Sequence, residues 1–360
     1  MKILITASRA LIAPAIIRNL ARHGHEVITA DSMRFGAGNS CNKKIKHIRI
    51  PSCRFNEDEF IRAINDIVKK EKVDIILPLG EEGYYLAKHK AELLCDCLVE
   101  DIEKIELLHN KMTFYALCTE LGIKTPYTEV ARCAGENKIY KRIFSRCGES
   151  TTLKANNVDF SSGEWIAQDF IEGMPISSFS VDESTLVYGA RFHNKIEPFS
   201  NLQVIDDIEL CKQAEDITNK IREHTNYQGV IGLDFILSDS GELFCIECNP
   251  RITSALLFMD NYDLISILLR QVNCIEVKEE TRKFIGHMFW QFLTCGVNLH
   301  NIKDYAFAML HFKESVFNVR DIKPFLASYM LNLEWMHIAR KNKITVQEAA
   351  SYDIQYNQSN

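Results

Sequence analysis

The sequence predicts two joined architectures: an α/β domain with a Rossmann-like parallel sheet, then an α+β domain with antiparallel strands and a C-terminal lobe. Apolar strand-like runs alternate with helical segments over about the first hundred residues, which is typical of a parallel sheet. Further along, two apolar runs at 229–237 and 243–248 flank Asp-Ser-Gly-Glu, a strong hairpin signal. The 360 residues, 46% of them hydrophobic, suffice for two or three domains.

The overall composition excludes some classes of partner. A formal net charge of -6 provides no basic stripe for a phosphate backbone, so we expect no nucleic acid, whereas a nucleotide fits well. The 12 cysteines are scattered, which favours a reducing cytoplasm. Ser8 and Arg9 interrupt the N-terminal apolar run, and the apolar stretch 256–269 contains Asp260 and Asp263, so neither export nor a membrane span is predicted.

Residues 1–107 form the predicted first domain, a glycine-poor βαβ unit and its continuation. Its expected elements are strands at 2–6, 26–31 and 73–78 and helices at 12–22, 57–70 and from the loop 79–83 to about 94. The first βα loop, 6–10, contains no glycine, so its backbone does not provide the close approach to a pyrophosphate that dinucleotide binding requires. Asp31 is then interpreted as a solvated strand-end residue.

Residues 108–275 form the predicted second domain. Its expected elements are a helix at 109–121, strands at 138–144, near 164–171, at 176–181 and at 185–191, a helix at 208–224, and the hairpin within 229–251. Gly122 stops the first helix, and Thr125-Pro126 opens a lysine-bearing unit at about 125–180. The antiparallel strands and the single-faced helix predict α+β packing.

The hairpin predicts a metal site. A two-residue loop at Ser240-Gly241 would pair residues whose numbers sum to 481, so Leu237 would face Phe244, Phe235 would face Ile246, and Asp234 would face Glu247. Like charges directly opposite each other destabilise a sheet unless a cation neutralises them.

Two further residues share the predicted acidic face by strand alternation. Asn249 adds an amide oxygen suited to Mg²⁺, and Arg251 extends a forked donor towards a phosphate or a carboxylate. The alternatives are an ordinary exposed face of an amphipathic hairpin, or a register shifted by one residue that would separate the two acids.

The segment GLDFILSDSGELFCIECNPR resembles the metal-binding segment of the ATP-grasp superfamily, which includes biotin carboxylase, D-alanine ligase and the large chain of carbamoyl phosphate synthetase. The resemblance extends over residues 1–275 and implies that Asp234, Glu247 and Asn249 hold Mg²⁺, or Mn²⁺ in its place, against the phosphates of ATP. It also places Lys111 of the entry helix and Lys141 of the lysine strand on those phosphates. The loop 145–148 resembles the phosphate-covering loop, with a single glycine where relatives have several.

The same resemblance identifies an adenine hinge in WIAQDFIEGMPISSFSVD. It implies main-chain contacts to the base from Asp169, Phe170 and Ile171, with the Phe170 ring packing nearby and Gln168 on the amino group. Pro175 stands where the family has an acid for the ribose, so Glu172 substitutes or the contact is lost. Arg191 and Lys195 resemble basic positions that touch the transferred phosphate, with solvated strand-end charges as the alternative.

Other motifs have simpler interpretations. Alternation sends the sulfurs of Cys245 and Cys248 to opposite faces of a strand, so this C-x-x-C predicts no zinc site. His193, His287 and His311 stand alone in apolar surroundings and are interpreted as packed histidines. Residues 276–360 form the predicted C-terminal lobe. Alternatively, this segment forms the interface of a homodimer or a wall of the substrate site.

These features favour an ADP-forming carboxylate–amine ligase that acts through an acyl phosphate, with ATP, a small carboxylate and an amine or amino acid as partners. The alternatives are phosphorylation of bicarbonate or carbamate, as in carbamoyl phosphate synthesis, and an ATP-binding module without turnover. The acceptor stays unnamed, because its site is expected to include first-domain loops, with Glu81 and Glu82, and the C-terminal lobe.

Overall fold

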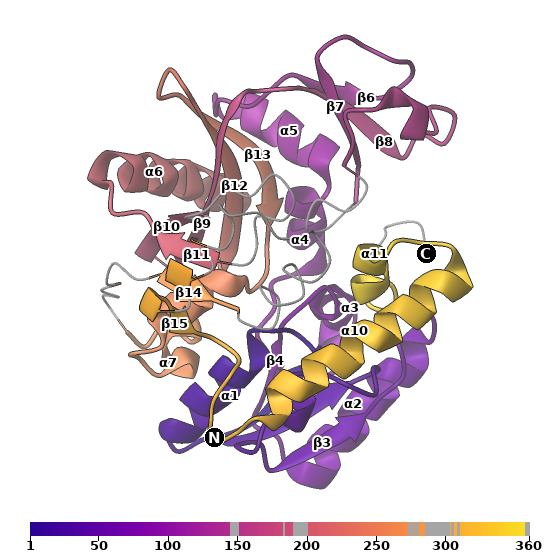
Figure 1. Cartoon of the computed structure of the whole chain (residues 1–360), viewed down its shortest axis with the longest axis vertical. Helices are drawn as coiled ribbons and strands as arrows, with labels where there is room; N and C mark the ends of the chain where they lie inside the picture. The colour runs from indigo at the N-terminus through magenta and orange to yellow at the C-terminus, as the bar shows by residue number, and fades with distance from the viewer. Residues whose placement is uncertain are drawn as a thin grey trace.

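The computed structural model of the 360-residue chain describes residues 1–144, 151–182, 184–189, 201–272, 281–284 and 310–356, with isolated positions 277, 303, 306 and 307. Figure 1 shows the N-terminal domain at the bottom, a small sheet at the top and a larger sheet with the hairpin at the side. Within the described ranges, no helix is long and apolar enough to cross a membrane.

The N-terminal domain is an open parallel sheet, as predicted. Its strand order is β3-β2-β1-β4-β5 and every pairing is parallel. The strands are β1 (Lys2–Thr6), β2 (Glu26–Asp31), β3 (Lys46–Arg49), β4 (Ile75–Pro78) and β5 (Asp96–Cys97), and the helices are α1 (Ala13–Arg22), α2 (Glu57–Glu71) and α3 (Glu82–Lys88). The central strands are apolar throughout because helices cover both faces of such a sheet.

Two helices lead from this domain into the next, α4 (Ile102–His109) and α5 (Lys111–Glu120). Asn110 separates them, and its side chain accepts hydrogen bonds from the backbone N–H groups of Met112 and Thr113. This cap starts α5 at Lys111, two residues later than predicted, because it satisfies donors that would otherwise lack partners at the helix start.

The second domain contains two antiparallel sheets. The small one has the order β6-β8-β7, with β6 (Thr128–Val130), β7 (Lys138–Arg142) and β8 (Trp165–Asp169). The large one has the order β13-β12-β9-β10-β11-β14-β15 within the described residues, with β9 (Gly173–Val181), β10 (Ser184–Gly189), β11 (Asn201–Val204), β12 (Ile231–Ser238), β13 (Leu243–Asn249), β14 (Thr281–Lys283) and β15 (Lys313–Glu314). These sheets confirm the predicted fold class.

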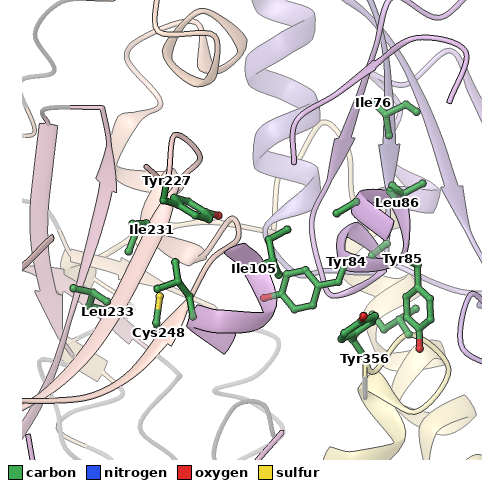
Figure 2. Packing of buried hydrophobic residues seen from close by; sticks show 14 of the residues in the cluster. Ile76, Tyr84, Tyr85, Leu86, Ile105, Tyr227, Ile231, Leu233, Cys248 and Tyr356 are labelled. Atoms are coloured by element: carbon green, nitrogen blue, oxygen red, sulfur yellow. The ribbon is translucent and has the colours of Figure 1, made fainter. Parts of the chain in front are cut away.

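Helices complete the second domain. α6 (Ile208–Thr225) packs one face on the large sheet, and α7 (Leu264–Leu268) lies near α1. Short 3-10 turns occupy Gly38–Ser40, Lys90–Glu92, Ala155–Asn157 and Ser254–Met259. One apolar cluster continues from the N-terminal sheet through α4 to the hairpin, and Figure 2 shows Ile76, Tyr84, Ile105, Leu233 and Cys248 along it. The two domains therefore share a core.

The hairpin turn differs from the prediction. Ser238 N–H donates to the Glu242 carbonyl at 2.9 Å, so the loop has three residues, and Gly241 takes the left-handed φ of 81° that such a loop requires. Leu237 therefore pairs with Leu243 rather than Phe244. A bulge next to Asp234 then inserts Ile246 into β13 and restores the pairing of Asp234 with Glu247. The longer loop and the bulge each shift the register by one residue, and the two shifts cancel. The predicted pairing of Asp234 with Glu247 is therefore confirmed.

The same bulge corrects the predicted orientation of the C-x-x-C pair, which had the two sulfurs on opposite faces of the strand. Because Ile246 is an extra residue, Cys245 and Cys248 both lie on the buried face of β13, and the Cys245 side chain is hydrogen bonded to that of Cys118. Burial raises the pKa of Cys245 and of Cys248 well above the ordinary thiol value. Protonated thiols are poor metal ligands, so these residues act as packing groups.

The end of the chain packs on the N-terminal domain. Two helices, α10 (Lys323–Asn342) and α11 (Val346–Ser351), lead to a tail at 352–356, and Figure 1 shows α10 alongside the first domain. Ile354 and Tyr356 belong to the apolar cluster of that domain. The segment predicted as a C-terminal lobe therefore contributes to the first domain's core.

A buried ion-pair network anchors the tail. The Arg9 guanidinium lies 2.6 Å from Asp31 Oδ1 and 2.6 Å from Asp353 Oδ1, and all three side chains are almost fully buried. The interpretation of Asp31 as a solvated residue was therefore wrong. Ser52 and the backbone N–H of Arg54 donate to the Asp353 carbonyl. The tail thus lies at the carboxyl edge of the parallel sheet.

We expect Asp353→Ala to lower the free energy of unfolding by roughly 3 kcal/mol or more, because the change leaves part of the buried Arg9 charge uncompensated. Urea unfolding followed by circular dichroism measures this change. Glu164→Ala, which removes an exposed partner of Arg142, is the matched control and should change stability by roughly 0.5 kcal/mol or less. Equal effects of the two substitutions would contradict the structural role of the network.

Candidate functional site

The centre of the site is the acidic face of the hairpin. Asp234 pairs with Glu247 across the two strands. Ser177, from the neighbouring strand β9, donates to Asp234 Oδ1 at 2.6 Å, and Asn249 Nδ2 donates to Asp234 Oδ2 at 2.9 Å. Arg251 in turn donates to Asn249 Oδ1 at 3.1 Å. The predicted metal ligands and Arg251 therefore lie together in one hydrogen-bonded group.

Two buried lysines face this group from other elements. The Nζ atom of Lys111, at the start of α5, lies 3.5 Å from Glu247 Oε2. Lys141 of β7 donates to Gln168 Oε1 at 2.8 Å, and Gln168 Nε2 donates to Thr128 Oγ1 at 2.9 Å. The side chains of Lys111, Lys141 and Gln168 are all buried. Tertiary packing thus brings both predicted phosphate-contacting lysines to the acids.

The charges at the centre are strongly coupled. Burial disfavours ionisation of Glu247, but Lys111 and Lys141 outweigh it and lower its pKa to about 2. Burial, together with the charge on Glu247, raises the pKa of Asp234 to about 7. Burial lowers the pKa of Lys141 against the opposing effect of Glu247. The site therefore favours one ionised carboxylate and holds a proton on the other.

A divalent cation fits this donor set. The two facing carboxylates and an amide oxygen are hard oxygen donors, and a cation would offset both the burial and the charge of Glu247 that keep Asp234 protonated. No group of three or more His, Cys, Asp or Glu side chains with the arrangement of a metal site occurs among the described residues. A cation held here by two acids would thus need ligands from solvent or phosphate, as is usual for Mg²⁺.

The predicted adenine hinge follows β8. Its backbone is partly committed to neighbouring strands, since Asp169 N–H donates to the Tyr127 carbonyl and Phe170 N–H to the Asn137 carbonyl. The Asp169 carboxylate lies 2.8 Å from Lys138 Nζ. Phe170 and Glu172 are exposed, and Ile171 is half-buried.

Three predicted features have other outcomes. Gln168, predicted to contact the adenine amino group, accepts a hydrogen bond from Lys141 and donates one to Thr128. Arg191 and Lys195 lie outside the described residues, as does the predicted covering loop from 145 onward.

The sequence analysis missed His109 and Ser177. His109 ends α4, with its ring 5.0 Å from that of Tyr84 and 5.7 Å from that of Phe144, and its buried Nε2 has no hydrogen-bond partner. Burial, with help from Lys111, lowers its pKa to about 4, so the ring is neutral at pH 7. The position of His109, two residues before Lys111, was the sequence feature that could have indicated its place near the site. Ser177 had no such feature, because only the pairing of β9 with β12 brings it to Asp234.

The chain is similar to known proteins in part of its sequence and in its fold. Residues 108–255 match the ATP-grasp domain family. The fold is similar to biotin carboxylase from Campylobacter jejuni, with a TM-score of 0.62 and 13% identity over 77% of this chain and 73% of that one. It is also similar to L-amino acid ligase from Bacillus licheniformis, with a TM-score of 0.60 and 13% identity over 78% of each chain.

A third similar structure contains a nucleotide. The biotin carboxylase domain of 2-oxoglutarate carboxylase from Hydrogenobacter thermophilus, solved with MgADP and bicarbonate, has a TM-score of 0.61 and 15% identity over 78% of this chain and 72% of that one. No curated protein matches the sequence. Residues 108–255 therefore carry an ATP-grasp domain, which confirms the resemblance for that part of the chain.

We expect Asp234→Asn to stabilise the metal-free protein relative to wild type as the pH rises from 5 to 8. The native state retains a proton on Asp234 that the unfolded chain loses near pH 4, so wild-type stability falls between about pH 4 and pH 7. The variant lacks this loss, and the difference should level off above about pH 7. Thermal unfolding in EDTA at several pH values measures it.

The control for this experiment is Asp239→Asn, at the exposed turn of the same hairpin. Its stability relative to wild type should not vary with pH in this window. A pH-independent difference for Asp234→Asn would mean that the acid pair does not retain a proton.

Proposed function

We propose that the protein is an ATP-dependent, ADP-forming carboxylate–amine ligase that requires Mg²⁺. The observation that supports this most directly is the convergence of Asp234, Glu247 and Asn249 with the buried Lys111 and Lys141. Acids that hold a divalent cation beside cations that contact phosphate oxygens suit phosphoryl transfer, in which the protein supplies position and charge.

In the proposed reaction, an oxygen of the substrate carboxylate attacks the γ-phosphorus of ATP. The bond from that phosphorus to the β–γ bridging oxygen breaks, which gives ADP and an acyl phosphate. The amine then attacks the acyl carbon and loses a proton, inorganic phosphate leaves, and an amide bond forms. No side-chain nucleophile is needed.

Each side chain has a proposed role in that sequence. Asp234, Glu247 and Asn249 would hold Mg²⁺, which supplies charge neutralisation at the phosphates. Lys111 and Lys141 would contact the phosphate oxygens, and Gln168 would hold Lys141 in place. Arg251 would hold the carboxylate, since its guanidinium lies beside Asn249. Arg191 and Lys195 would contact the transferred phosphate.

The proposal also includes the contacts to the nucleoside of ATP and the cellular location of the protein. Asp169, Phe170 and Ile171 would place the adenine, with Glu172 at the ribose. All nine cysteines in the described part of the chain are free, which suits a reducing compartment, and we propose the cytoplasm.

We expect Asp234→Asn combined with Glu247→Gln to weaken Mg²⁺-dependent ATP binding at least 100-fold, because the change removes both anionic oxygen ligands of the cation. Isothermal titration with ATP in Mg²⁺ and in EDTA measures the effect. The matched control carries Asp239→Asn and Glu242→Gln at the exposed turn of the same hairpin, and should bind as wild type. Unchanged Mg²⁺-dependent binding in the first variant would refute the metal site.

We also expect wild-type protein to release ADP from Mg-ATP only when a carboxylate and an amine are supplied together, or faster with both than with either. A coupled ADP assay over pooled acids and amines measures this, with the acid-pair variant as the inactive control. Release with bicarbonate alone would favour the carbamoyl-phosphate type of reaction. Tight Mg-ATP binding with no release from any pool would indicate a binding module without turnover.

A further inference from the structure

A cavity of about 380 Å³ lies between the N-terminal domain and the hairpin. A volume of this size falls within the range of small-molecule sites in proteins. Its walls come from the end of β4 and the start of α3, from 97–100, from 227–230, from 250–252 and from the end of α7. Figure 2 shows Tyr84, Ile105 and Tyr227, three of its lining residues, in the region where the two domains meet.

The cavity adjoins the proposed metal site at Arg251. Arg251 lines the cavity and also donates to Asn249 Oδ1 at 3.1 Å, and Asn249 donates to Asp234 at 2.9 Å. A group that contacts the guanidinium from the cavity would therefore lie one side chain away from the ligand set of the cation. The cavity is in a position to present a reacting group to the phosphates.

The lining is mainly apolar and includes three cationic side chains. The apolar residues are mainly Pro78, Leu98, Val99, Val230, Ile252, Leu268 and Leu269. The cations are Arg251, Lys90, which lies 3.1 Å from Asp101, and Arg270, which lies 3.9 Å from Asp182.

Glu100 is the acid of the lining, and its carboxylate already accepts from the backbone N–H groups of Asp101 and Gln228. Lys90 and Arg270 already lie near acids, so we assign the anionic group of a ligand to Arg251, which borders the proposed metal site. The walls favour an apolar body.

The other candidate position for an acceptor is closed by the chain itself. Asp353 and Ile354 cover the carboxyl edge of the parallel sheet, where the space around Arg9 and Asp31 amounts to about 10 Å³. The Glu81 carboxylate accepts from Tyr356 N–H.

Glu82, the second acid proposed for the acceptor, is also committed to the protein. Its carboxylate accepts from Thr6 and from the backbone N–H groups of Leu79 and Gly80. These two acids, predicted to help form the acceptor site, hold the tail and the loop in place.

We propose that the interdomain cavity binds the carboxylic acid substrate, with its carboxylate at Arg251 and an aliphatic or aromatic body between the apolar walls. The inference rests on the proposed function and deepens it, since it selects an apolar monocarboxylic acid of several carbons over bicarbonate. Bicarbonate has no apolar body to bury, so the walls would contribute nothing to its affinity.

The experiment titrates three probes, isovalerate, octanoate and 3-phenylpropanoate, into the whole protein by calorimetry, with 3-phenylpropanamide as the neutral comparison. Val99→Phe and Leu268→Phe narrow the cavity from opposite walls, and Leu326→Phe, on the exposed face of α10, is the matched control. We expect at least one of the three acids to bind. If 3-phenylpropanoate binds, the amide should bind at least 10-fold more weakly than that acid. Both narrowed variants should lose at least 10-fold in affinity for the acids. The control should stay within two-fold of wild type.

Two outcomes would overturn the proposal: no binding of any of the three acids, or binding that both narrowed variants retain while circular dichroism shows them folded. Titration of Mg-ATP into the same samples separates this test from that of the proposed function. If Mg-ATP binds normally and no acid does, the cavity assignment alone fails. If acids bind in the cavity but Mg-ATP does not, the site stands and the ligase function fails.

Discussion

The buried pairing of Asp234 with Glu247 constrains much of the surrounding structure. Two carboxylates that face each other away from water require positive charge, and the fold supplies it from two distant elements. Lys111 reaches Glu247 because an asparagine cap starts α5 at that residue. Lys141 is held by Gln168 of the adjacent strand β8. Burial and the charge on Glu247 raise the pKa of Asp234, and a divalent cation at the pair would offset both effects.

A second constraint is the connection between the domains. The apolar cluster runs without interruption from the parallel sheet to the hairpin, and the tail closes the sheet edge through Arg9 and Asp353. A Rossmann-like sheet commonly binds its ligand at that edge, in the crevice beyond the strands' carboxyl ends. Here the chain's own residues occupy it, and the larger space lies between the domains beside Arg251. The first domain thus forms part of the wall of this cavity.

The hairpin shows how a sequence argument succeeds and fails at once. The acid pair was predicted from a two-residue turn, yet the turn has three residues and a bulge at Ile246 compensates. Strand alternation contains no information about a bulge, because alternation assumes one partner for each residue and a bulge adds a residue to one strand only. The same limit explains why Cys245 and Cys248 were assigned to opposite faces. Asp31 was misjudged for a related reason, since its partner Asp353 follows it by more than three hundred residues.

The sequence by itself determined the fold class and the order of the elements, because local periodicity is a property of short segments. It also predicted the candidate site residues Asp234, Glu247, Asn249, Lys111 and Lys141 from a glycine turn and a family motif. Only the tertiary structure decided which groups meet. Ser177 reaches Asp234 through the pairing of β9 with β12, His109 enters through the turn between α4 and α5, and the cavity exists only where two domains abut. Such contacts join segments far apart in the chain, and no local pattern specifies them.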